Sequence, residues 1–411
     1  MTFSRRGLIQ RSAAVGLLLP AARLLATART STVVDGFVGT FTYPPGAKLP
    51  AEFGRHSQVS HGLYRFGFDT ASGHAGPIRL AAELESPAHL IVHPNRKRLY
   101  ACQGQHAIRD GQNLISAFAI EPGRLRPLNS IVSGGTGPSV GVIDRSGLNL
   151  LTANWSSGSV VCIRLHADGS LDERSALIGN PPGARTPPPP RPGQPRLTTA
   201  VAANTVRPNK PHSVLLSASE RYAIVAEIAL NRCAVYRFDA AAGSLSLHGY
   251  GQAADGSGPR HLARHPNGRF FYSADEEGSS VTVWRWDEAQ GSLVAIQQLS
   301  TVAPEQRQGN LAADIAMHPS GLLVYASNRG SGQLAGFRID PASGRLEALP
   351  RTTLSSSACW SLDIDPSGRW LLTSTLSGDD VSIYRIDLRS GALKATGQHL
   401  PVVTPTCLRL V

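Results

Sequence analysis

A sequence pattern recurs about every 48 residues along this chain and limits its architecture more than any other property. Each copy has an apolar strand that starts at or near a proline, a polar turn, a second apolar strand, an alternating third strand that ends near Asp, and a turn before a fourth strand. In the clearest copy the strand start and the two turns are residues 258–262 (GPRHL), 265–269 (HPNGR) and 291–293 (GSL). The first-turn proline or its equivalent falls at Pro94, Arg145, Ala218, Pro266, Pro319 and Pro366.

Four short strands in a repeat of this length are typical of one blade of a β-propeller. The turn positions are separated by 51, 73, 48, 53 and 47 residues, and the long separation contains a Pro-rich stretch at residues 181–196. Such a stretch favours an extended, solvated conformation, so we predict an inserted loop there that decorates the rim. Within the copies, large apolar residues alternate with polar ones, as at residues 281–286, which indicates strands with one buried face.

The two ends of the chain supply a seventh blade. Residues 405–410 have the pattern of a first strand with no second strand after it, whereas residues 38–41, 63–68 and 78–84 have the pattern of strands two to four. Joining these segments closes a ring and removes two free sheet edges. We therefore predict that residues 29–411 form an all-β, seven-bladed β-propeller, closed by a C-terminal first strand that joins N-terminal strands two to four. A large β-sandwich would leave the repeated turn unexplained.

Residues 1–28 have the pattern of an export signal and are excluded from the predicted fold. Arg5 and Arg6 form a twin-arginine pair ahead of an apolar run, residues 13–19, which is too short to span a bilayer. Residues 26–28 (ATA) supply a small-residue cleavage site. We predict export to a bacterial periplasm by the twin-arginine machinery, with no stable membrane anchor. The alternative is a chance arginine pair before a hydrophobic patch.

Charge and cysteine content restrict the partners. The chain carries a net charge of +11, and residues 1–28 hold four arginines and no acidic residue, which leaves +7 for the remainder. No Lys/Arg cluster is present, so we expect no nucleic acid partner. A small anionic substrate suits the basic balance, although an unspecific charge balance explains it equally well. The cysteines are odd in number, contain no C-x-x-C pair and lie in apolar, strand-like stretches, so we predict no disulfide framework and no metal site of cysteines; they are Cys102, Cys162, Cys233, Cys359 and Cys407. We expect no metal and no cofactor in the site.

Polar side chains gather at one rim of the predicted ring. The first two strands of a blade are antiparallel, so the start of the first and the end of the second emerge on the same rim. The starts carry His89, Ser139, His212, Arg260, Asp314 and Trp360, and the ends carry Gln103, Asn154, Glu227, Asp275, Glu276, Asn328 and Arg329. Such groups converging on one mouth can form a ligand site.

The sequence singles out some of these candidates more strongly than others. His212, Arg260, Glu276 and Arg329 stand out because each occurs in a single blade. Polar residues that follow a strand usually form turns with their own backbone, and this alternative is equally good for Asn154, Asp275 and Asn328. The turn histidines recur at one repeat position and are predicted to be structural; they are His93, His265 and His318.

Residues 38–42 (VGTFT), 258–262 (GPRHL) and 326–330 (ASNRG) resemble the propeller lactonase family, which contains bacterial propeller-type 6-phosphogluconolactonases and fungal carboxymuconate lactonizing enzymes. The resemblance covers nearly all of residues 33–411. In that family one His, two Arg and one Glu form the proposed catalytic and substrate-binding set, which by motif falls on His212, Arg260, Arg329 and Glu276.

The sequence departs from the family pattern at three places. Lys210 stands where the family often has a second His, and residues 138–140 (PSV) and 313–316 (ADIA) replace segments that contain His in the family. These changes alter the mouth without removing the four matched residues. The three changes therefore bear more on which substrate is bound than on which type of reaction is catalysed.

Lactone hydrolysis needs a base that activates water and a cation that stabilises the developing oxyanion. We expect His212 to be the base, with Glu276 orienting it or acting as the base itself, and Arg260 to supply the cation. Arg329 is expected to bind the substrate, together with the polar strand-end residues Asn328, Asn154 and Asp275.

The sequence thus predicts a metal-independent lactonase, similar to 6-phosphogluconolactonases, that acts on a sugar-acid or related anionic lactone in the periplasm. Export argues against 6-phosphogluconolactone itself, which belongs to cytoplasmic metabolism. Two alternatives stay open. One is a muconate-type lactonizing enzyme, which closes the ring with the same groups, and the other is a non-catalytic propeller that binds a ligand or a protein.

Overall fold

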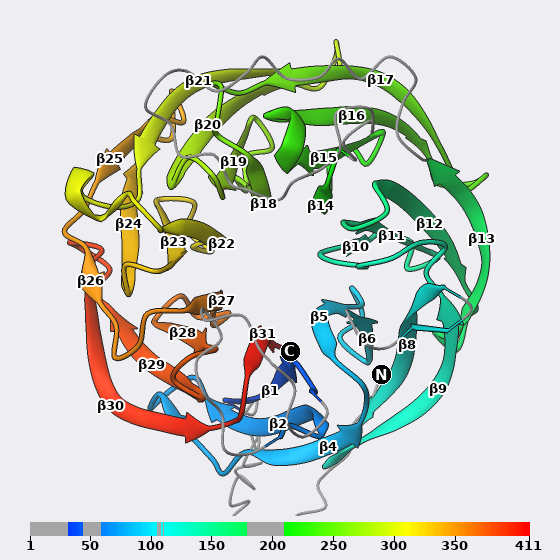
Figure 1. Cartoon of the computed structure of the whole chain (residues 1–411), viewed down its shortest axis with the longest axis horizontal. Helices are drawn as coiled ribbons and strands as arrows, with labels where there is room; N and C mark the ends of the chain where they lie inside the picture. Colours follow the sequence, from blue (N-terminus) through cyan, green and yellow to red (C-terminus); the bar gives the residue numbers. More distant parts are fainter. Residues whose placement is uncertain (1–31, 44–58, 105–107, 110, 179–208) are drawn as a thin grey trace, which may run out of the picture. The chain divides into compact units, whose positions relative to one another are not determined.

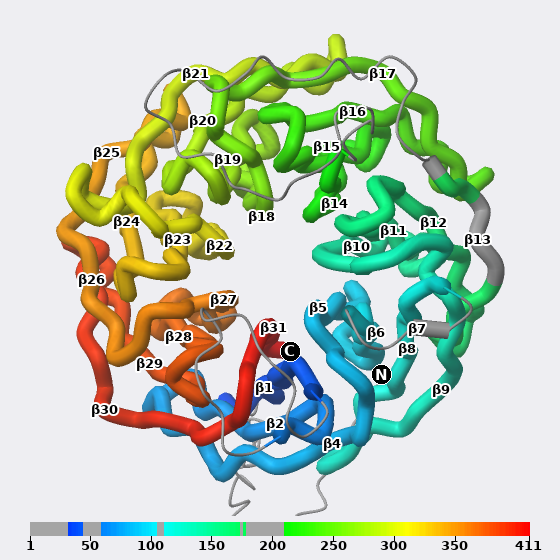
Figure 2. Tube along the Cα trace, in the orientation of Figure 1, coloured from blue at the N-terminus to red at the C-terminus, as the bar shows by residue number. Residues whose placement is uncertain are grey.

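The structure is a computed structural model, and it describes residues 32–43, 59–104, 108–109, 111–178 and 209–411. The predicted export signal at residues 1–28 and the predicted Pro-rich loop at residues 181–196 lie outside the described residues. Thr32–Val411 form one compact unit. Its strands make seven antiparallel sheets around a central axis (Figure 1), and the Cα trace passes through these blades in sequence order (Figure 2).

We number the blades 1 to 7 in the order of their innermost strands, and give the strands of each blade from the inside outwards. Blade 1 contains β5 (Pro87–Val92), β6 (Arg98–Gln103) and β8 (Gln112–Glu121), with both β7 (Ile108–Arg109) and β9 (Arg124–Val132) paired to β8. Blade 2 contains β10 (Val142–Ile143), β11 (Asn149–Asn154), β12 (Ser159–Leu165) and β13 (Leu171–Ile178). Blade 3 contains β14 (Pro211–Leu216), β15 (Tyr222–Glu227), β16 (Arg232–Asp239) and β17 (Ser244–Gln252).

The remaining blades follow the same plan. Blade 4 contains β18 (Pro259–Arg264), β19 (Phe270–Asp275), β20 (Ser280–Asp287) and β21 (Ser292–Ser300). Blade 5 contains β22 (Leu311–Met317), β23 (Leu323–Arg329), β24 (Gln333–Ile339), β25 (Leu346–Ala348) and β26 (Thr352–Thr353). Blade 6 contains β27 (Cys359–Ile364), β28 (Trp370–Thr375), β29 (Asp380–Ile386) and β30 (Leu393–Pro401).

Blade 7 is built from both ends of the described chain. It contains β31 (Pro405–Leu410), β1 (Val33–Thr40), β2 (Gly62–Asp69), β3 (His74–Ala75) and β4 (Arg79–Glu83). The innermost strand β31 pairs antiparallel with β1, so that Leu408 lies opposite Val38. The predicted all-β, seven-bladed propeller and its closure are confirmed. Apart from strands, the described residues contain the short 3-10 helices η2 (Ile228–Leu230) and η3 (Pro304–Gln306).

The recurrent turn histidines join three of the blades to the blades that follow them. Nε2 of His265 lies 2.8 Å from the carbonyl oxygen of Gly321, and Nε2 of His318 lies 2.8 Å from that of Gly368. His93 makes the equivalent contact with Gly147 at 3.1 Å. Each glycine belongs to the corresponding turn of the following blade. These contacts confirm the structural role that the repeat predicted for the three histidines.

The hydrophobic core lies between neighbouring blades. Phe270 and Tyr272 of blade 4, for example, pack in one cluster with Val324 and Phe337 of blade 5. The five cysteines, predicted from their apolar surroundings to lie in strands, are all buried and unpaired. Burial raises the pKa of the Cys102 thiol to about 12, so the thiol form is favoured there.

The closing strand β31 supplies a test of this architecture. Leu408 is fully buried and packs against Val38 and Phe66 of the same blade. We expect Leu408→Ala to lower the free energy of unfolding by about 2–5 kcal/mol, because it removes methyl groups from a packed site. Leu388→Ala is the matched control, since Leu388 is 56% exposed, and should change that free energy by less than about 0.5 kcal/mol. Urea denaturation of both variants measures the difference, and equal losses would contradict the role of β31.

Candidate functional site

A β-bulge at the start of the inner strands determines which side chains reach the axis. In blades 3, 4 and 6 the register with the second strand shifts at one residue, which is His212, Arg260 and Trp360 respectively. A bulge leaves this residue outside the regular alternation and redirects its side chain. Two consecutive residues, such as Arg260 and His261, can therefore both face the centre of the ring.

The first component of the site is a carboxylate held between two guanidinium groups. Oε2 of Glu276 lies 2.9 Å from Nε of Arg260 and 2.8 Å from Nη2 of Arg329. Arg260 comes from the inner strand of blade 4, Glu276 follows β19 of the same blade, and Arg329 ends β23 of blade 5. The structure thus brings together three of the four residues that the sequence singled out.

The guanidinium group of Arg329 keeps hydrogen-bonding capacity for a ligand. Nε of Arg260 and Nη2 of Arg329 face Oε2 of Glu276 in the ion pairs, whereas Nε of Arg329 is buried and has no hydrogen-bond partner among the described residues. The Arg260 side chain is only 1% exposed and that of Arg329 is 11% exposed. Buried N–H groups without acceptors are costly, and a bound anion would satisfy them. The ring of Trp360 lies beside both groups, 5.7 Å from Arg260 and 4.8 Å from Arg329.

Arg260 and Glu276 both stay charged at neutral pH. Burial lowers the pKa of Arg260, helped by the neighbouring Arg329, but only to about 10, so Arg260 remains a cation. Burial alone would raise the pKa of Glu276, but the positive charges of Arg329 and Arg260 outweigh it and hold that pKa below its ordinary value. Glu276 is therefore a carboxylate and Arg260 a guanidinium cation.

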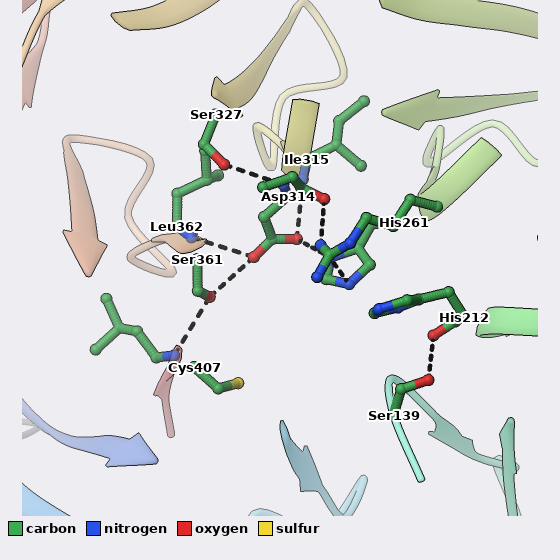
Figure 3. Close-up of polar contacts among 12 residues, drawn as sticks. Ser139, His212, His261, Asp314, Ile315, Ser327, Ser361, Leu362 and Cys407 are labelled. Carbon is green, nitrogen blue, oxygen red and sulfur yellow. Dashed lines mark hydrogen bonds and ion pairs between the residues drawn. The ribbon is translucent and has the colours of Figure 1, made fainter. Parts of the chain in front are cut away.

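The second component is a histidine–aspartate pair that supports Arg260 (Figure 3). Nδ1 of His261 lies 2.7 Å from Oδ1 of Asp314, and Nε2 of His261 lies 3.0 Å from Nη1 of Arg260. Because a guanidinium only donates, Nε2 must accept and Nδ1 must carry the proton. Burial, together with the charge of Arg260, lowers the pKa of His261 to about 4. His261 and Asp314 are thus joined by a hydrogen bond of neutral imidazole to carboxylate.

Asp314 is itself fixed by donors from three directions. Its Oδ2 accepts hydrogen bonds from Oγ of Ser361 at 2.8 Å and from the backbone N–H of Leu362 at 3.1 Å, and its Oδ1 accepts one from the N–H of Ile315. Nη1 of Arg260 also donates to the carbonyl oxygen of Ala313 at 2.6 Å. Blades 4, 5 and 6 therefore fix the orientation of Arg260 through one hydrogen-bonded chain.

The third component is His212, which is buried between two other imidazoles. Its ring centroid lies 5.0 Å from that of His261 and 5.5 Å from that of His89. Its backbone oxygen accepts a hydrogen bond from Oγ of Ser139 at 2.6 Å, which ties blade 3 to blade 2 (Figure 3). Nδ1 of His212 is buried and has no hydrogen-bond partner among the described residues.

The imidazole of His212 is the neutral form at physiological pH. Burial, followed by the charge of Arg260 and the proximity of His261, holds its pKa well below 6.5. A neutral imidazole with an uncommitted nitrogen can accept a proton from water or from a substrate hydroxyl. His212 packs against His261, and His261 in turn contacts Arg260 of the guanidinium pair. All four residues that the sequence singled out therefore lie in one cluster.

Three other predicted site residues form hydrogen bonds with residues outside the cluster. Asp275 accepts hydrogen bonds from Ser273, Ser280 and Thr282, and burial raises its pKa to about 6 against these hydrogen bonds. Nδ2 of Asn154 donates to the carbonyl oxygen of Ser133 and to Ser159. Oδ1 of Asn328 accepts hydrogen bonds from Thr301 and Asn310. The structure shows no contact of these side chains with the cluster, and their predicted substrate-binding role stays a prediction.

No role for His261 was predicted from the sequence. The residue directly follows Arg260, and in a regular strand it would face the other side of the sheet. The bulge cancels this alternation, and its signal in the sequence is only the repeated proline at the start of the inner strand. Other members of the larger set of strand starts also contact the cluster, namely Asp314, His89 and Trp360.

The described residues contain no group of three His, Cys, Asp or Glu side chains arranged to hold a metal ion. Over the same part of the chain, no helix has the length and apolar character needed to cross a membrane.

The Asp314–His261 contact predicts a specific tautomer. In ¹⁵N-histidine NMR spectra we expect His261 to be protonated at Nδ1 only and to stay neutral as the pH falls from about 7 to about 5, because its pKa is lowered to about 4. His261 and Leu362 both donate hydrogen bonds to the Asp314 carboxylate, and in Asp314→Asn one of these donors must face an N–H group of the carboxamide instead. This mismatch should change the His261 signals and lower the free energy of unfolding by about 1–3 kcal/mol. The exposed Asp340→Asn is the control and should leave these signals unchanged. An Nε2-protonated His261 in the unmodified protein would contradict the assignment.

Comparison with known proteins adds the family. The family described as "Lactonase, 7-bladed beta-propeller" matches residues 36–410. A 6-phosphogluconolactonase from Bacillus subtilis is 26% identical over 92% of this chain and 98% of its own length. A periplasmic gluconolactonase from Pseudomonas aeruginosa has 25% identity and a TM-score of 0.76 over 92% of this chain and 99% of its own. A putative 6-phosphogluconolactonase from Bacteroides fragilis matches equally well, with 25% identity and a TM-score of 0.76 over 93% and 99% of the two chains. The predicted resemblance is confirmed, and the chain belongs to the lactonase family of seven-bladed β-propellers.

Proposed function

We propose that this protein hydrolyses a sugar-acid or related anionic lactone in the periplasm, without a metal. The observation that carries the proposal is the cluster of His212, Arg260, Glu276 and Arg329, in which a neutral imidazole stands near two largely buried guanidinium groups. The Arg329 group keeps one N–H donor, at Nε, without a partner among the described residues. A base and a preorganised cation are the two groups that lactone hydrolysis needs. Membership of the lactonase family supports the same reaction class.

In this mechanism His212 is the general base. As the oxygen of water forms a bond to the lactone carbonyl carbon, the imidazole takes one proton from that water, and the carbonyl oxygen becomes an oxyanion. When the tetrahedral intermediate collapses, the bond between the carbonyl carbon and the ring oxygen breaks, and the imidazolium returns its proton to that oxygen. The product is the open hydroxy acid, and no redox step is involved.

Arg260 and Arg329 supply the positive charge for the oxyanion and then for the product carboxylate. Buried guanidinium N–H groups stabilise a developing negative charge more strongly than water does, because they need no reorganisation at the moment of reaction. Glu276 holds the two guanidinium groups together despite their repulsion. Its own pKa is lowered by these cations, which makes it a weaker candidate for the base than His212.

Location and substrate form the second part of the proposal. The twin-arginine pattern at Arg5 and Arg6 supports export, and one structural relative is named a periplasmic gluconolactonase. Several relatives are named 6-phosphogluconolactonases, but a phosphorylated cytoplasmic intermediate does not suit an exported enzyme. We therefore propose an unphosphorylated sugar-acid lactone or another exported anionic lactone as the substrate. Two guanidinium groups provide the cationic assistance, so the mechanism requires no metal.

The test is hydrolysis of a panel of aldonolactones by the mature protein and by two variants. We expect His212→Ala to lower kcat about 10²–10⁴-fold, since it removes the base, and Arg260→Ala to lower it about 10²–10³-fold, since it removes an oxyanion donor. His74→Ala is the control, because His74 is exposed on the outer strand β3. Circular dichroism verifies folding, and Arg260→Lys serves if Arg260→Ala does not fold. Turnover that is absent, or unaffected by both changes, would instead support a non-catalytic binding propeller.

The pH dependence gives a second test. The active base is the neutral imidazole, which exists above the folded-state pKa of His212, and that pKa is held well below 6.5. We therefore expect kcat/KM to stay constant as the pH falls from about 7.5 through 6.5 and to decline only at lower pH. Initial rates measured at several pH values, corrected for spontaneous hydrolysis, check this. A midpoint near 6.5 would show that the base is not the buried His212.

A further inference from the structure

The backbone before the inner strands adopts a left-handed conformation in five of the seven blades. The φ angles are 41° at Ser86, 70° at Gly137, 50° at Lys210, 64° at Gly258 and 50° at Thr404, and each residue directly precedes a proline that starts its strand segment. Glycine adopts this conformation without steric cost, and other residues do so only under strain. Ser86, Lys210 and Thr404 are therefore the strained members of this set.

Two of the strained residues are compensated by their own side chains. Oγ of Ser86 accepts a hydrogen bond from the N–H of Thr42 and donates one to its carbonyl oxygen, both at 3.1 Å. Oγ1 of Thr404 donates to the carbonyl oxygen of Phe41 at 2.6 Å. The side chain of Lys210, in contrast, makes no hydrogen bond or ion pair with any described residue. The side-chain hydrogen bonds that compensate the strained backbone at Ser86 and Thr404 therefore have no counterpart at Lys210.

The ammonium group of Lys210 lies at the edge of the candidate site. It stands 5.3 Å from the ring centroid of Trp155, and that ring lies 6.4 Å from the imidazole of His212. Burial raises the pKa of Glu276, and the charges of Arg329, Arg260 and, after them, Lys210 lower it, which is in keeping with this position of the ammonium group. The cluster thus contains three cations and the single carboxylate of Glu276, while Asp314 is held on the far side of His261 by its own donors.

The Lys210 ammonium contacts the ring of Trp155 but forms no hydrogen bond or ion pair among the described residues. A strained cation of this kind beside a candidate catalytic cluster suggests a ligand role. Hydrolysis of a neutral lactone needs positive charge only at the scissile carbonyl, which Arg260 and Arg329 already provide. We propose that the Lys210 ammonium binds an anionic substituent, a carboxylate or a phosphate, on the lactone substrate, so that the site prefers lactones that carry such a group. This inference rests on the proposed function and makes Lys210 a specificity-determining residue of that site.

The test compares three lactones: neutral D-glucono-1,5-lactone, D-glucaro-1,4-lactone with its free carboxylate, and 6-phosphoglucono-1,5-lactone. In Lys210→Gln we expect the ratio of kcat/KM for an anionic lactone to that for the neutral lactone to fall about tenfold, mainly through KM, because one charged hydrogen bond is lost. Lys210→Arg should keep most of the ratio. A loss with the glucarolactone alone, or with the phosphorylated lactone alone, identifies which anion the residue binds.

Two controls separate this role from a structural one. Lys394→Gln removes one charge from the exposed face of β30 and should leave the ratio unchanged. Lys210→Gly relieves the backbone strain, as Gly137 and Gly258 do in their blades, so we expect its Tm to be equal or higher while the ratio falls as in Lys210→Gln. An unchanged ratio in both Lys210→Gln and Lys210→Gly overturns the inference, even if all three lactones are hydrolysed.

Binding of the acid products tests Lys210 independently of turnover. Calorimetric titration with glucarate, 6-phosphogluconate and gluconate should show that Lys210→Gln weakens glucarate or 6-phosphogluconate binding about tenfold and gluconate binding less. If the unmodified protein hydrolyses no lactone, the proposed function fails, and this titration still decides the role of Lys210. Equal weakening for all three acids, or no binding of either glucarate or 6-phosphogluconate, contradicts it.

Discussion

The structure depends on the packing of each β-sheet against its two neighbours. A four-stranded blade has two apolar faces and cannot bury either of them alone, so the hydrophobic clusters span adjacent blades. Val38 and Phe66 of blade 7, for instance, share a cluster with Leu372 and Ile383 of blade 6. Since apolar burial is the main favourable term in folding, the ring is stable only when every blade has both neighbours.

The same arrangement creates the candidate site. Packing sheets around an axis brings the starts of the inner strands together, although they are far apart in the sequence (Figure 1). Arg260, Asp314 and Ser361 come from three consecutive blades, yet they belong to one hydrogen-bonded chain through His261. In a buried environment such contacts are stronger than in water, which fixes Arg260 before any ligand binds.

The sequence was sufficient for the architecture because turns and strand alternation are local properties. The spacing of turns such as those at Pro266 and Pro319 predicted the blades, and the incomplete patterns at the two ends predicted the closure. The site was only partly predictable. His212 and Arg260 could be named from the sequence because they are polar residues at strand starts and match the family motifs. Asp275 and Asn328 have the same polar character at strand ends, but their side chains accept hydrogen bonds from Ser273 and Thr301.

His261 shows why the remainder could not be predicted. Whether a residue at the start of an inner strand faces the axis depends on a shift of register between two strands, and a single sequence does not state that register. The same limit applies to Lys210, whose residue type gives no indication of its left-handed backbone. Both features depend on how strands pair, which is a property of the whole blade.

The pairing of β31 with β1 has a consequence for biosynthesis. A ribosome makes β1 long before β31, so the inner edge of β1 stays without its partner until residues 405–410 have been synthesised. The ring therefore cannot close while only the other blades have been made. Loss of β31 would leave β1 as an unpaired inner strand, an edge of the kind that promotes aggregation of incomplete chains.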